Sequence, residues 1–392
     1  MNSSTVVLGK IAKISSGGTP DRDTPSYWDG DIPWVKTAQI QNCFINADDV
    51  DEWITPVGLR NSAAKMVPKG TILMAMYGQG KTRGQVAILG LDATVNQACA
   101  AIELNTEVSR DYVYQQLLFR YKAIRALSNT GSQENLNAGL IREIGFPLPA
   151  RREQDYVAEL LANWDAAIEK TEQLMALRAR QKAWLRAQVI SSLGHTTKLG
   201  DFLKQESRPE PKPTEPYWAL GIRSHGKGTF QRFVKDPASV DMEELYAVNR
   251  DNLIVNITFA WEGAIAFVKP EDERCLVSHR FPTYEVNNEI ADPVFVKYIV
   301  NCKAFFSKLA LISPGGAGRN RVLNKKDFLK LEVSLPPLAE QTRLAMILAT
   351  TDLLIEKETS LLVALKSQKR GLVQKLLTGQ WRVPIENKEV AA

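Results

Sequence analysis

An internal repeat constrains this chain more than any other feature of its sequence. Residues 131–192 align without a gap on residues 318–379, an offset of 187 positions. A repeat of this length makes each copy one structural unit, so the fold must be built twice. The stretches before the two copies are only loosely alike. The order is therefore variable unit, repeated segment, variable unit, repeated segment. The identical pairs include Leu136/Leu323, Pro149/Pro336, Gln154/Gln341, Asp165/Asp352, Ile168/Ile355 and Leu185/Leu372.

Both repeated segments are predicted to be long helices. Pro149 and Pro336–Pro337 stand where a helix can begin, and Gly194 and Gly379 where it can stop. Apolar residues recur at a spacing of three and four, which is typical of a coiled-coil seam. We interpret the two helices as antiparallel struts that hold two domains apart; the alternative is two helices of one bundle. The seam residues are Val157, Leu161, Trp164, Ile168 and Leu185 in the first copy and Leu344, Leu348, Ile355, Leu362 and Leu372 in the second.

The variable units are predicted to mix strands with shorter helices. Short apolar runs bounded by glycine, asparagine and charged residues indicate strands. The segments 112–127 and 294–311 are predicted to be helical. The expected fold class is α+β, with two globular domains separated by two long antiparallel coiled-coil helices and a pseudo-two-fold internal repeat. The expected strands cover 71–76, 85–89, 253–258 and 264–268.

Composition excludes several classes of protein. Hydrophobic residues make up 44% and charged residues 24%, values of a folded protein. No run approaches the ~18 apolar residues of a membrane span, and the first ten residues do not resemble a signal peptide, so we expect a cytoplasmic protein. The net charge of +5 permits an anionic partner. Four cysteines without a Cys-x-x-Cys pair and three histidines without ligand spacing predict no disulfide framework and no metal site.

No catalytic pattern is present. The sequence contains neither an Asn-Pro-Pro-Tyr box for adenine methylation nor a Gly-x-Gly-x-x-Gly dinucleotide motif. Gly78–Thr82 resembles the end of a P-loop, but Ala75 stands where that pattern has its first glycine, and a strand is expected to follow instead of a helix. The dipeptides Glu169-Lys170 and Glu356-Lys357 are interpreted as a solvated helix face. These absences indicate a binding protein rather than an enzyme.

Several motifs together resemble one family. The opening carries Leu8-Gly9, Gly17-Gly18-Thr19-Pro20, Tyr27-Trp28 and Ile32-Pro33-Trp34. The two junctions carry Pro149 with Glu153-Gln154 and Pro336-Pro337 with Glu340-Gln341. From Val7 to Gln380 the chain resembles the specificity (S) subunit of type I restriction-modification enzymes. The second variable unit departs from the opening motif, since residues 208–213 read Arg-Pro-Glu-Pro-Lys-Pro in place of Gly-Gly-Thr-Pro.

The resemblance implies a division into two target-recognition domains and two spacer helices. The first target-recognition domain would span residues 1–150 and the first spacer helix 151–195. The second domain would span 196–336, the second spacer helix 337–380 and a C-terminal tail 381–392. Each domain would read one half of a bipartite DNA target, and the antiparallel coiled coil would fix the gap between the halves.

The resemblance also implies partners. Two modification subunits would supply S-adenosylmethionine and adenine methylation, and two restriction subunits would supply ATP- and Mg-dependent translocation and cleavage. This chain would bind double-stranded DNA, hold no cofactor or metal of its own and catalyse nothing. Two alternatives stay open: a coiled-coil scaffold without DNA specificity, and a nucleotide-driven enzyme resting on Gly78–Thr82.

Basic residues in glycine-rich loops are the candidate DNA contacts. Glycines let the backbone approach DNA closely, and arginine, lysine and asparagine suit phosphate and base edges. The sequence therefore predicts contacts in both variable units. The candidates are Arg22, Lys81 and Arg83 in the first unit and Arg223, His225, Lys227, Arg319, Asn320 and Arg321 in the second.

Overall fold

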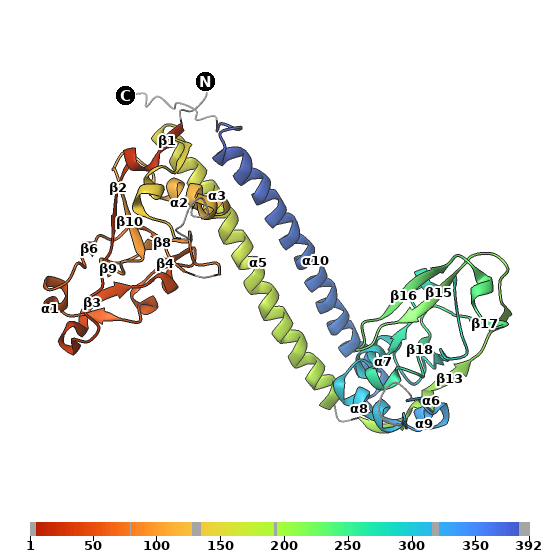
Figure 1. The fold of residues 1–392 in the computed structure, drawn as a ribbon. Helices are drawn as coiled ribbons and strands as arrows, with labels where there is room; N and C mark the ends of the chain where they lie inside the picture. The colour runs from red at the N-terminus through yellow and green to blue at the C-terminus, as the bar shows by residue number, and fades with distance from the viewer. Residues whose placement is uncertain (1–4, 79, 128–134, 192–193, 316–320, 384–392) are drawn as a thin grey trace, which may run out of the picture. The chain divides into compact units, whose positions relative to one another are not determined.

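A computed structural model describes residues 5–78, 80–127, 135–191, 194–315 and 321–383 (Figure 1). The chain divides into two compact units. Unit 1 comprises Met1–Glu172 together with Leu361–Ala392, and unit 2 comprises Gln173–Ser360. Each unit thus combines one variable unit of the sequence with part of each repeated segment.

Unit 1 contains a central sheet with both faces covered. Its strand order is β2-β10-β7-β8-β4, and β7 and β8 are buried along their whole length. Ile72 and Met74 pack on one face with residues of helices α2, α3 and α4, while Leu73 and Ala75 pack on the other with residues of a second sheet. The strands are uniformly apolar because both faces are buried. The elements are β2 (Ala12–Ser16), β4 (Cys43–Ile45), β7 (Ile72–Ala75), β8 (Val86–Leu89), β10 (Cys99–Leu104), α2 (Arg110–Phe119), α3 (Tyr121–Leu127) and α4 (Ala138–Arg142).

The second sheet of unit 1 has the order β5-β3-β9-β6. Strands β3 and β9 run parallel, and β5 and β6 flank them antiparallel. A two-stranded pair, β1 with β11, leads into the first long helix. The elements are β3 (Trp28–Val35), β5 (Trp53–Ile54), β6 (Met66–Val67), β9 (Ala93–Val95), β1 (Thr5–Val7), β11 (Gly145–Pro147) and the short helix α1 (Pro56–Arg60).

Unit 2 repeats this topology strand by strand. Its central sheet, β13-β21-β18-β19, has the same neighbours and directions as β2-β10-β7-β8. In its second sheet, β15 and β20 are parallel as β3 and β9 are, with β16 and β17 flanking. The units differ by one edge strand each, β4 in unit 1 and β14 in unit 2. The loose likeness of the variable units therefore reflects a common fold.

The elements of unit 2 follow one another along the chain in the same order as their counterparts in unit 1. Helices α7 and α8 occupy the place of α2 and α3, and α9 that of α4. The elements are β12 (His195–Lys198), α6 (Leu199–Phe202), β13 (Leu203–Glu206), β14 (Pro209–Pro211), β15 (Tyr217–Ile222), β16 (Thr229–Val234), β17 (Glu244–Ala247), β18 (Leu253–Val255), β19 (Ile265–Phe267), β20 (Cys275–Val277), β21 (Thr283–Val286), α7 (Pro293–Val300), α8 (Lys303–Leu311), α9 (Lys325–Leu329) and β22 (Glu332–Leu335).

Two long helices, α5 (Arg151–Ser191) and α10 (Leu338–Leu377), pair antiparallel within each unit. In unit 1, Asp165 and Glu172 of α5 form ion pairs with Lys369 and Lys366 of α10 respectively. In unit 2, Arg178 of α5 pairs with Glu358, and Lys182 further along α5 pairs with Asp352 earlier in α10. Residue numbers rise along one helix as they fall along the other. The predicted α+β class with a repeated unit and two long antiparallel helices is confirmed.

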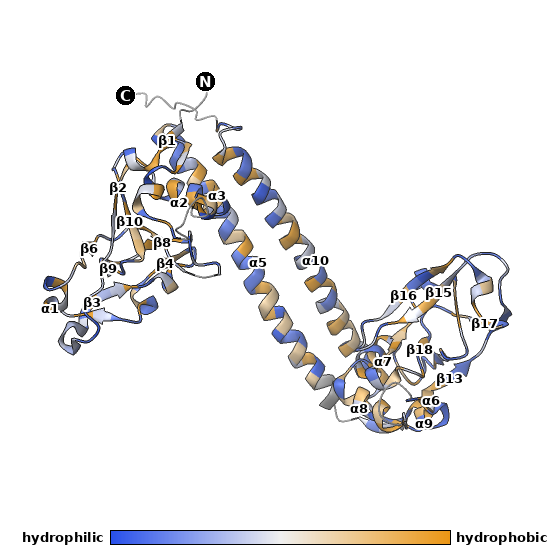
Figure 2. Ribbon diagram, viewed as in Figure 1, coloured by the Kyte–Doolittle hydropathy of each residue, from blue (hydrophilic) through white to orange (hydrophobic). Residues whose placement is uncertain are grey.

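The predicted seam residues lie on the more buried side of these helices. Val157, Leu161, Leu344 and Leu348 are buried, and the other six are half-buried. In Figure 2 both helices alternate hydrophobic and hydrophilic residues, as expected for a helix pair that stays partly exposed. Within the described residues, no helix combines the length and apolarity needed to span a membrane.

Candidate nucleic-acid interface

Apart from the loop of Arg22, the basic loops that the sequence predicted as DNA contacts gather at the same corner of the central sheet in each unit. In unit 1 this corner is the connection from β7 to β8; in unit 2 it is the connection from β18 to β19. The loop after α3 returns to the first connection where Leu136 N donates to Met76 O at 3.1 Å. The loop after α8 returns to the second where Leu323 N donates to Ile257 O at 2.8 Å. We call these the unit 1 corner and the unit 2 corner.

The backbone of the unit 1 corner is held by helix α3. Tyr121 donates from its hydroxyl to the Lys81 carbonyl at 2.5 Å, and Arg125 donates to that hydroxyl at 2.8 Å. Gly84 has a φ of +84°, which allows the chain to turn into β8. The Lys81 side chain is exposed, while the Nε of Arg83 is buried without a hydrogen-bond partner among the described residues. The corner thus presents cationic groups from a fixed backbone.

This geometry does not fit a nucleotide-binding P-loop. Gly78–Thr82 is followed by Gly84 and strand β8, which pairs antiparallel with β7. A P-loop needs a helix at this place, because the helix N-terminus contributes to phosphate binding. Gln79 lies outside the described residues. The connection joins two antiparallel strands, and the predicted strand after it is confirmed.

The unit 2 corner is built on a short 3₁₀ helix, η6 (Ala260–Glu262). Arg321 lies over the ring of Trp261, with its guanidinium carbon 5.3 Å from the ring centroid. Trp261 is fixed in turn by donating from Nε1 to Thr258 O at 3.1 Å. Such a cation–π contact holds a guanidinium in place without consuming its hydrogen-bond donors. The other two candidates of this loop, Arg319 and Asn320, lie outside the described residues.

The tip of the β15–β16 hairpin is bonded directly to η6. His225 N donates to Glu262 O at 2.8 Å, and Gly226 N donates to Gly263 O at 2.9 Å. Arg223 donates from Nη1 to Thr229 O at 2.8 Å, and His225 and Lys227 are exposed. Through η6 the structure brings together the candidates Arg223, His225, Lys227 and Arg321, which lie almost 100 residues apart in sequence.

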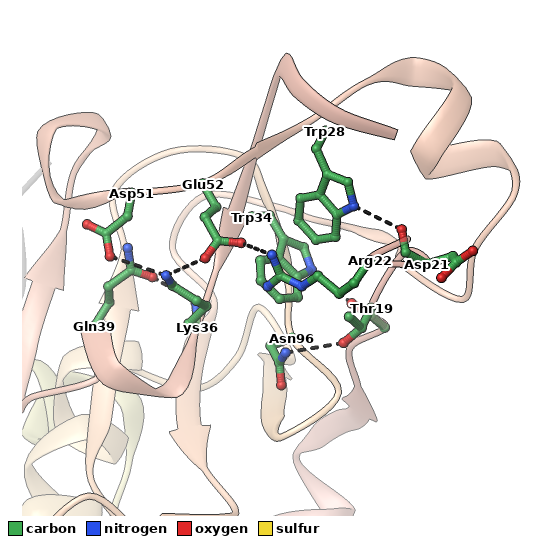
Figure 3. Close-up of polar contacts among 11 residues, drawn as sticks. Thr19, Asp21, Arg22, Trp28, Trp34, Lys36, Gln39, Asp51, Glu52 and Asn96 are labelled. Carbon is green, nitrogen blue, oxygen red and sulfur yellow. Dashed lines mark hydrogen bonds and ion pairs between the residues drawn. The ribbon is translucent and has the colours of Figure 1, made fainter. Parts of the chain in front are cut away.

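Arg22 lies in a different setting, beside the second sheet of unit 1 (Figure 3). Its guanidinium carbon is 4.0 Å from the Trp28 ring and 4.7 Å from the Trp34 ring, and Nη1 donates to Glu52 Oε2 at 2.5 Å. Glu52 Oε1 accepts a bond from Lys36 Nζ at 2.6 Å. We call Arg22, Trp28, Trp34, Lys36 and Glu52 the opening cluster.

The charges of the opening cluster compensate one another. Burial acts to raise the pKa of Glu52, but hydrogen bonds from Lys36 and Arg22 outweigh it and hold the pKa below its ordinary 4.5. The same carboxylate raises the pKa of Lys36. Asp51 lies 3.4 Å from Lys36 and adds a second negative charge. With Asp51 counted beside the cluster, the two cations Arg22 and Lys36 are balanced by two carboxylates.

Close packing explains the two glycines and the tryptophan of the opening motif, Gly17, Gly18 and Trp34. A Cβ on Gly17 would lie 1.9 Å from Val95 O, and one on Gly18 would lie 2.3 Å from the Ala63 carbonyl carbon. Trp34 is fully buried and donates from Nε1 to Gly18 O at 2.9 Å. The glycines are needed because neighbouring backbone occupies the space of their side chains.

Sequence reasoning missed Lys36 and Glu52. The two residues stand 16 positions apart, and no pattern in the sequence connects them to Arg22. Only the pairing of β3 with β5 brings them side by side, because Glu52 directly precedes β5 and Lys36 directly follows β3. The position of Lys36 after Ile-Pro-Trp-Val was the available signal.

The described residues contain no group of three or more histidine, cysteine, aspartate or glutamate side chains able to hold a metal ion. All four cysteines are free thiols. Burial raises the pKa of Cys99 to about 12 and that of Cys275 to about 11, so neither is a ready nucleophile.

Comparison with known proteins identifies relatives of both halves. A family model described as type I restriction modification DNA specificity domain matches residues 2–177 and 195–367. The chain is 29% identical over 164 residues to the type I restriction enzyme MjaIX specificity subunit of Methanocaldococcus jannaschii, covering 41% of this chain and 37% of that protein. It is 26% identical over 194 residues to the EcoR124I/EcoR124II specificity subunit of Escherichia coli, covering 47% of each. These two alignments span less than half of either relative.

Longer alignments of lower identity extend over nearly the whole chain. The StySPI specificity subunit of Salmonella potsdam is 22% identical over 392 residues, with 90% of this chain and 83% of that protein covered. The crystal structure of the type I restriction-modification S subunit from M. genitalium matches with a TM-score of 0.54 at 14% identity, covering 95% of this chain and 96% of that one. The HsdS subunit of Thermoanaerobacter tengcongensis gives 0.53 at 14% identity, covering 96% and 97%. The two structures support the fold.

Proposed function

Since the chain belongs to the family of type I restriction-modification DNA specificity domains, we propose that it is the sequence-recognition subunit of a type I restriction-modification complex. In this proposal each unit carries a reading domain, meaning its two sheets with their short helices, and each reading domain binds one half of a bipartite duplex target. The proposed boundaries are residues 1–150 and 196–336 for the reading domains, with helices at 151–195 and 337–380 and a tail at 381–392.

The observation that carries this proposal is the recurrence of a basic corner at one topological position in two units. A β-hairpin fits the major groove, where base edges can be distinguished. Arg321 offers a guanidinium group in a stacked, fixed orientation, and the half-buried Arg83 adds a positive charge to the unit 1 corner. Lys81, His225 and Lys227 are exposed beside them and suit phosphate oxygens.

Catalysis belongs to partner subunits in this proposal. Modification subunits would bring S-adenosylmethionine for adenine methylation, and restriction subunits would bring ATP- and Mg-dependent translocation and cleavage. The role of this chain is to bind DNA and to place the partners on it. A DNA-directed complex of this kind would work in the cytoplasm.

Exposed apolar residues on the long helices supply a surface for those partners. Leu177 and Trp184 of α5 are 60% and 61% exposed, and Met346 of α10 is 65% exposed, all within unit 2. In unit 1, Val363 of α10 is 65% exposed. Large apolar side chains at this exposure are typical of contact surfaces.

Binding to defined DNA tests the proposal. The chain would be assembled with its matching modification subunit and titrated onto bipartite sites deduced from the methylated adenines of the host genome. We expect tighter binding to these sites than to scrambled duplexes of equal length. Equal affinity for both would contradict sequence recognition.

A coiled-coil scaffold without DNA specificity is the second candidate, favoured by the exposed apolar residues of the helices. Replacing Arg319 and Arg321 with alanine distinguishes the two. Loss of DNA binding with intact partner assembly supports the reading function. Intact partner assembly, together with binding that is equal on bipartite and scrambled duplexes and is not changed by the substitutions, supports the scaffold.

A further inference from the structure

A buried glutamine joins each reading domain to the long helix that follows it. In unit 1, Gln154 lies in the first turn of α5 and is 2% exposed. Its Oε1 accepts from Ser109 N, at the start of α2, at 2.9 Å, and its Nε2 donates to Pro149 O at 2.8 Å. One side chain thus connects a helix of the reading domain, the chain entering α5 and α5 itself.

Gln341 makes the same connection in unit 2. It is 1% exposed, its Oε1 accepts from Asp292 N at 3.0 Å, and Asp292 is the N-cap of α7. Its Nε2 donates to Pro336 O at 2.9 Å and to Ile290 O at 3.1 Å. The bonds to Asp292 N and Pro336 O correspond to those of Gln154, because α7 holds the place of α2 and Pro336 that of Pro149; the bond to Ile290 O is additional.

Glutamine is suited to this place because its amide both accepts and donates hydrogen bonds. An apolar side chain would leave a buried N–H and a buried carbonyl without partners, which costs more than the bonds themselves contribute. A tyrosine of each reading-domain helix makes a further contact nearby: Tyr112 of α2 donates to Pro147 O in β11 at 2.9 Å, and Tyr298 of α7 donates to Asp352 Oδ2 in α10 at 2.9 Å.

We propose that Gln154 and Gln341 are positioning residues that fix the angle between each reading domain and its long helix, and thereby set how strictly the complex measures the gap between half-sites. The inference rests on the proposed function. Gln154 lies at the start of α5 and Gln341 at the start of α10, and these two helices pair antiparallel. A looser joint at the start of either helix would therefore make the distance between the half-sites less strictly defined without changing a base contact.

The test compares full-length Gln154→Leu, Gln154→Glu and Gln341→Leu with the wild type, each assembled with the modification subunit. Glutamate keeps the acceptor for Ser109 N and loses the donor to Pro149 O. Gln368→Leu is the matched control, because Gln368 is an exposed glutamine of α10. Binding is measured on duplexes that keep both half-sites and vary the gap one base pair at a time, and on duplexes with altered half-sites.

We expect both leucine variants to keep the base preference of each half-site. The ratio of their affinities for the preferred gap and for a gap changed by one base pair should fall about threefold to tenfold. A change of this size is equivalent to one ordinary hydrogen bond. Gln154→Glu should fall at least as far as Gln154→Leu, because its buried carboxylate would face the Pro149 carbonyl oxygen without a donor, and Gln368→Leu should match the wild type. Faster hydrogen exchange in peptides covering Ser109 or Asp292 should accompany the weaker discrimination between gap lengths.

Unchanged gap discrimination in folded leucine variants would overturn the positioning role, and so would a loss of base preference along with it. If Gln154→Leu does not fold, Gln154→Glu and Gln341→Leu still decide the question. Failure of the proposed function is a different result, since the wild type itself would then fail to discriminate between half-sites.

Discussion

Arg178 Nε lies 2.5 Å from Glu358 Oε1, although 180 residues separate the two in sequence. Their side chains are 27% and 12% exposed, and the second carboxylate oxygen of Glu358 is buried without a hydrogen-bond partner among the described residues. This ion pair fixes the register of α5 against α10 within unit 2.

Replacing Arg178 with alanine should destabilise unit 2 by about 1–3 kcal/mol, because a largely buried carboxylate loses its counter-charge. Glu358→Gln should cost less, since it removes the charge as well as the pairing. Hydrogen exchange in peptides from 173–187 measures the effect locally. A combined Arg178→Glu, Glu358→Arg variant that gains nothing over Arg178→Glu alone would argue against direct pairing.

Glu52→Gln should loosen the opening cluster and change its response to acid. The folded-state pKa of Glu52 is depressed, so its contribution to stability is present above about pH 4.5 and is lost as the pH falls through the folded-state value. The wild type should therefore lose more stability than Glu52→Gln in this acid range. Thermal unfolding followed by tryptophan fluorescence reports the change, because Trp28 and Trp34 flank Arg22. Parallel pH profiles of the two proteins would contradict this account.

Arg321→Ala should weaken binding to the half-site read by unit 2. Trp261→Leu should weaken it less, because Arg321 keeps its charge and loses only its fixed orientation. If Arg321 contacts a phosphate, the slope of the logarithm of the binding constant against the logarithm of the salt concentration should become less steep by about one, because one counterion fewer is released. Lys357→Ala, an exposed substitution in α10, serves as the control. An unchanged affinity with Arg321→Ala would place the DNA contacts of unit 2 elsewhere.

Inserting about four residues after Thr171 of α5 should alter the preferred gap between half-sites and leave the half-sites themselves unchanged. One helical turn adds about 6 Å of helix, which corresponds to roughly two base pairs. Methylation of a duplex library with varied gaps measures the preference. The same insertion in the turn at Asn288 lies outside the long helices and should have no such effect. An unaltered gap would refute the spacer role of α5.

The sequence predicted local structure well and long-range pairing poorly. The seam from Val157 to Ile168 and the prolines before each helix predict α5 and α10, because helix periodicity and helix-start signals are local. The parallel pairing of β3 with β9 brings Trp34 beside Thr94, and nothing near either residue indicates it. Strands as short as β5, with two residues, carry too little pattern to be predicted.

In the candidate site, too, local features could be predicted from the sequence and long-range contacts could not. Glycines and cations indicated the loops around Lys81 and Arg321, because such composition is local. The bond from His225 to Glu262 and the stacking of Arg321 on Trp261 depend on which strands are neighbours in unit 2. The ion pair of Arg22 with Glu52 depends in the same way on strand pairing in the second sheet of unit 1. These contacts follow from long-range strand pairing, which no local pattern in the sequence indicates.

The division of the chain between the two units also bears on synthesis. Unit 2 is one uninterrupted stretch, Gln173–Ser360, whereas unit 1 needs residues from both sides of it. A ribosome therefore completes the polypeptide of unit 2 while Val157 and Leu161 still lack Leu376 and Leu377, with which they share a buried cluster. A nascent chain released before the codon for Leu361 would carry a complete second unit and a first unit without its α10 residues, so premature termination at that point should expose apolar surface at α5 rather than in unit 2.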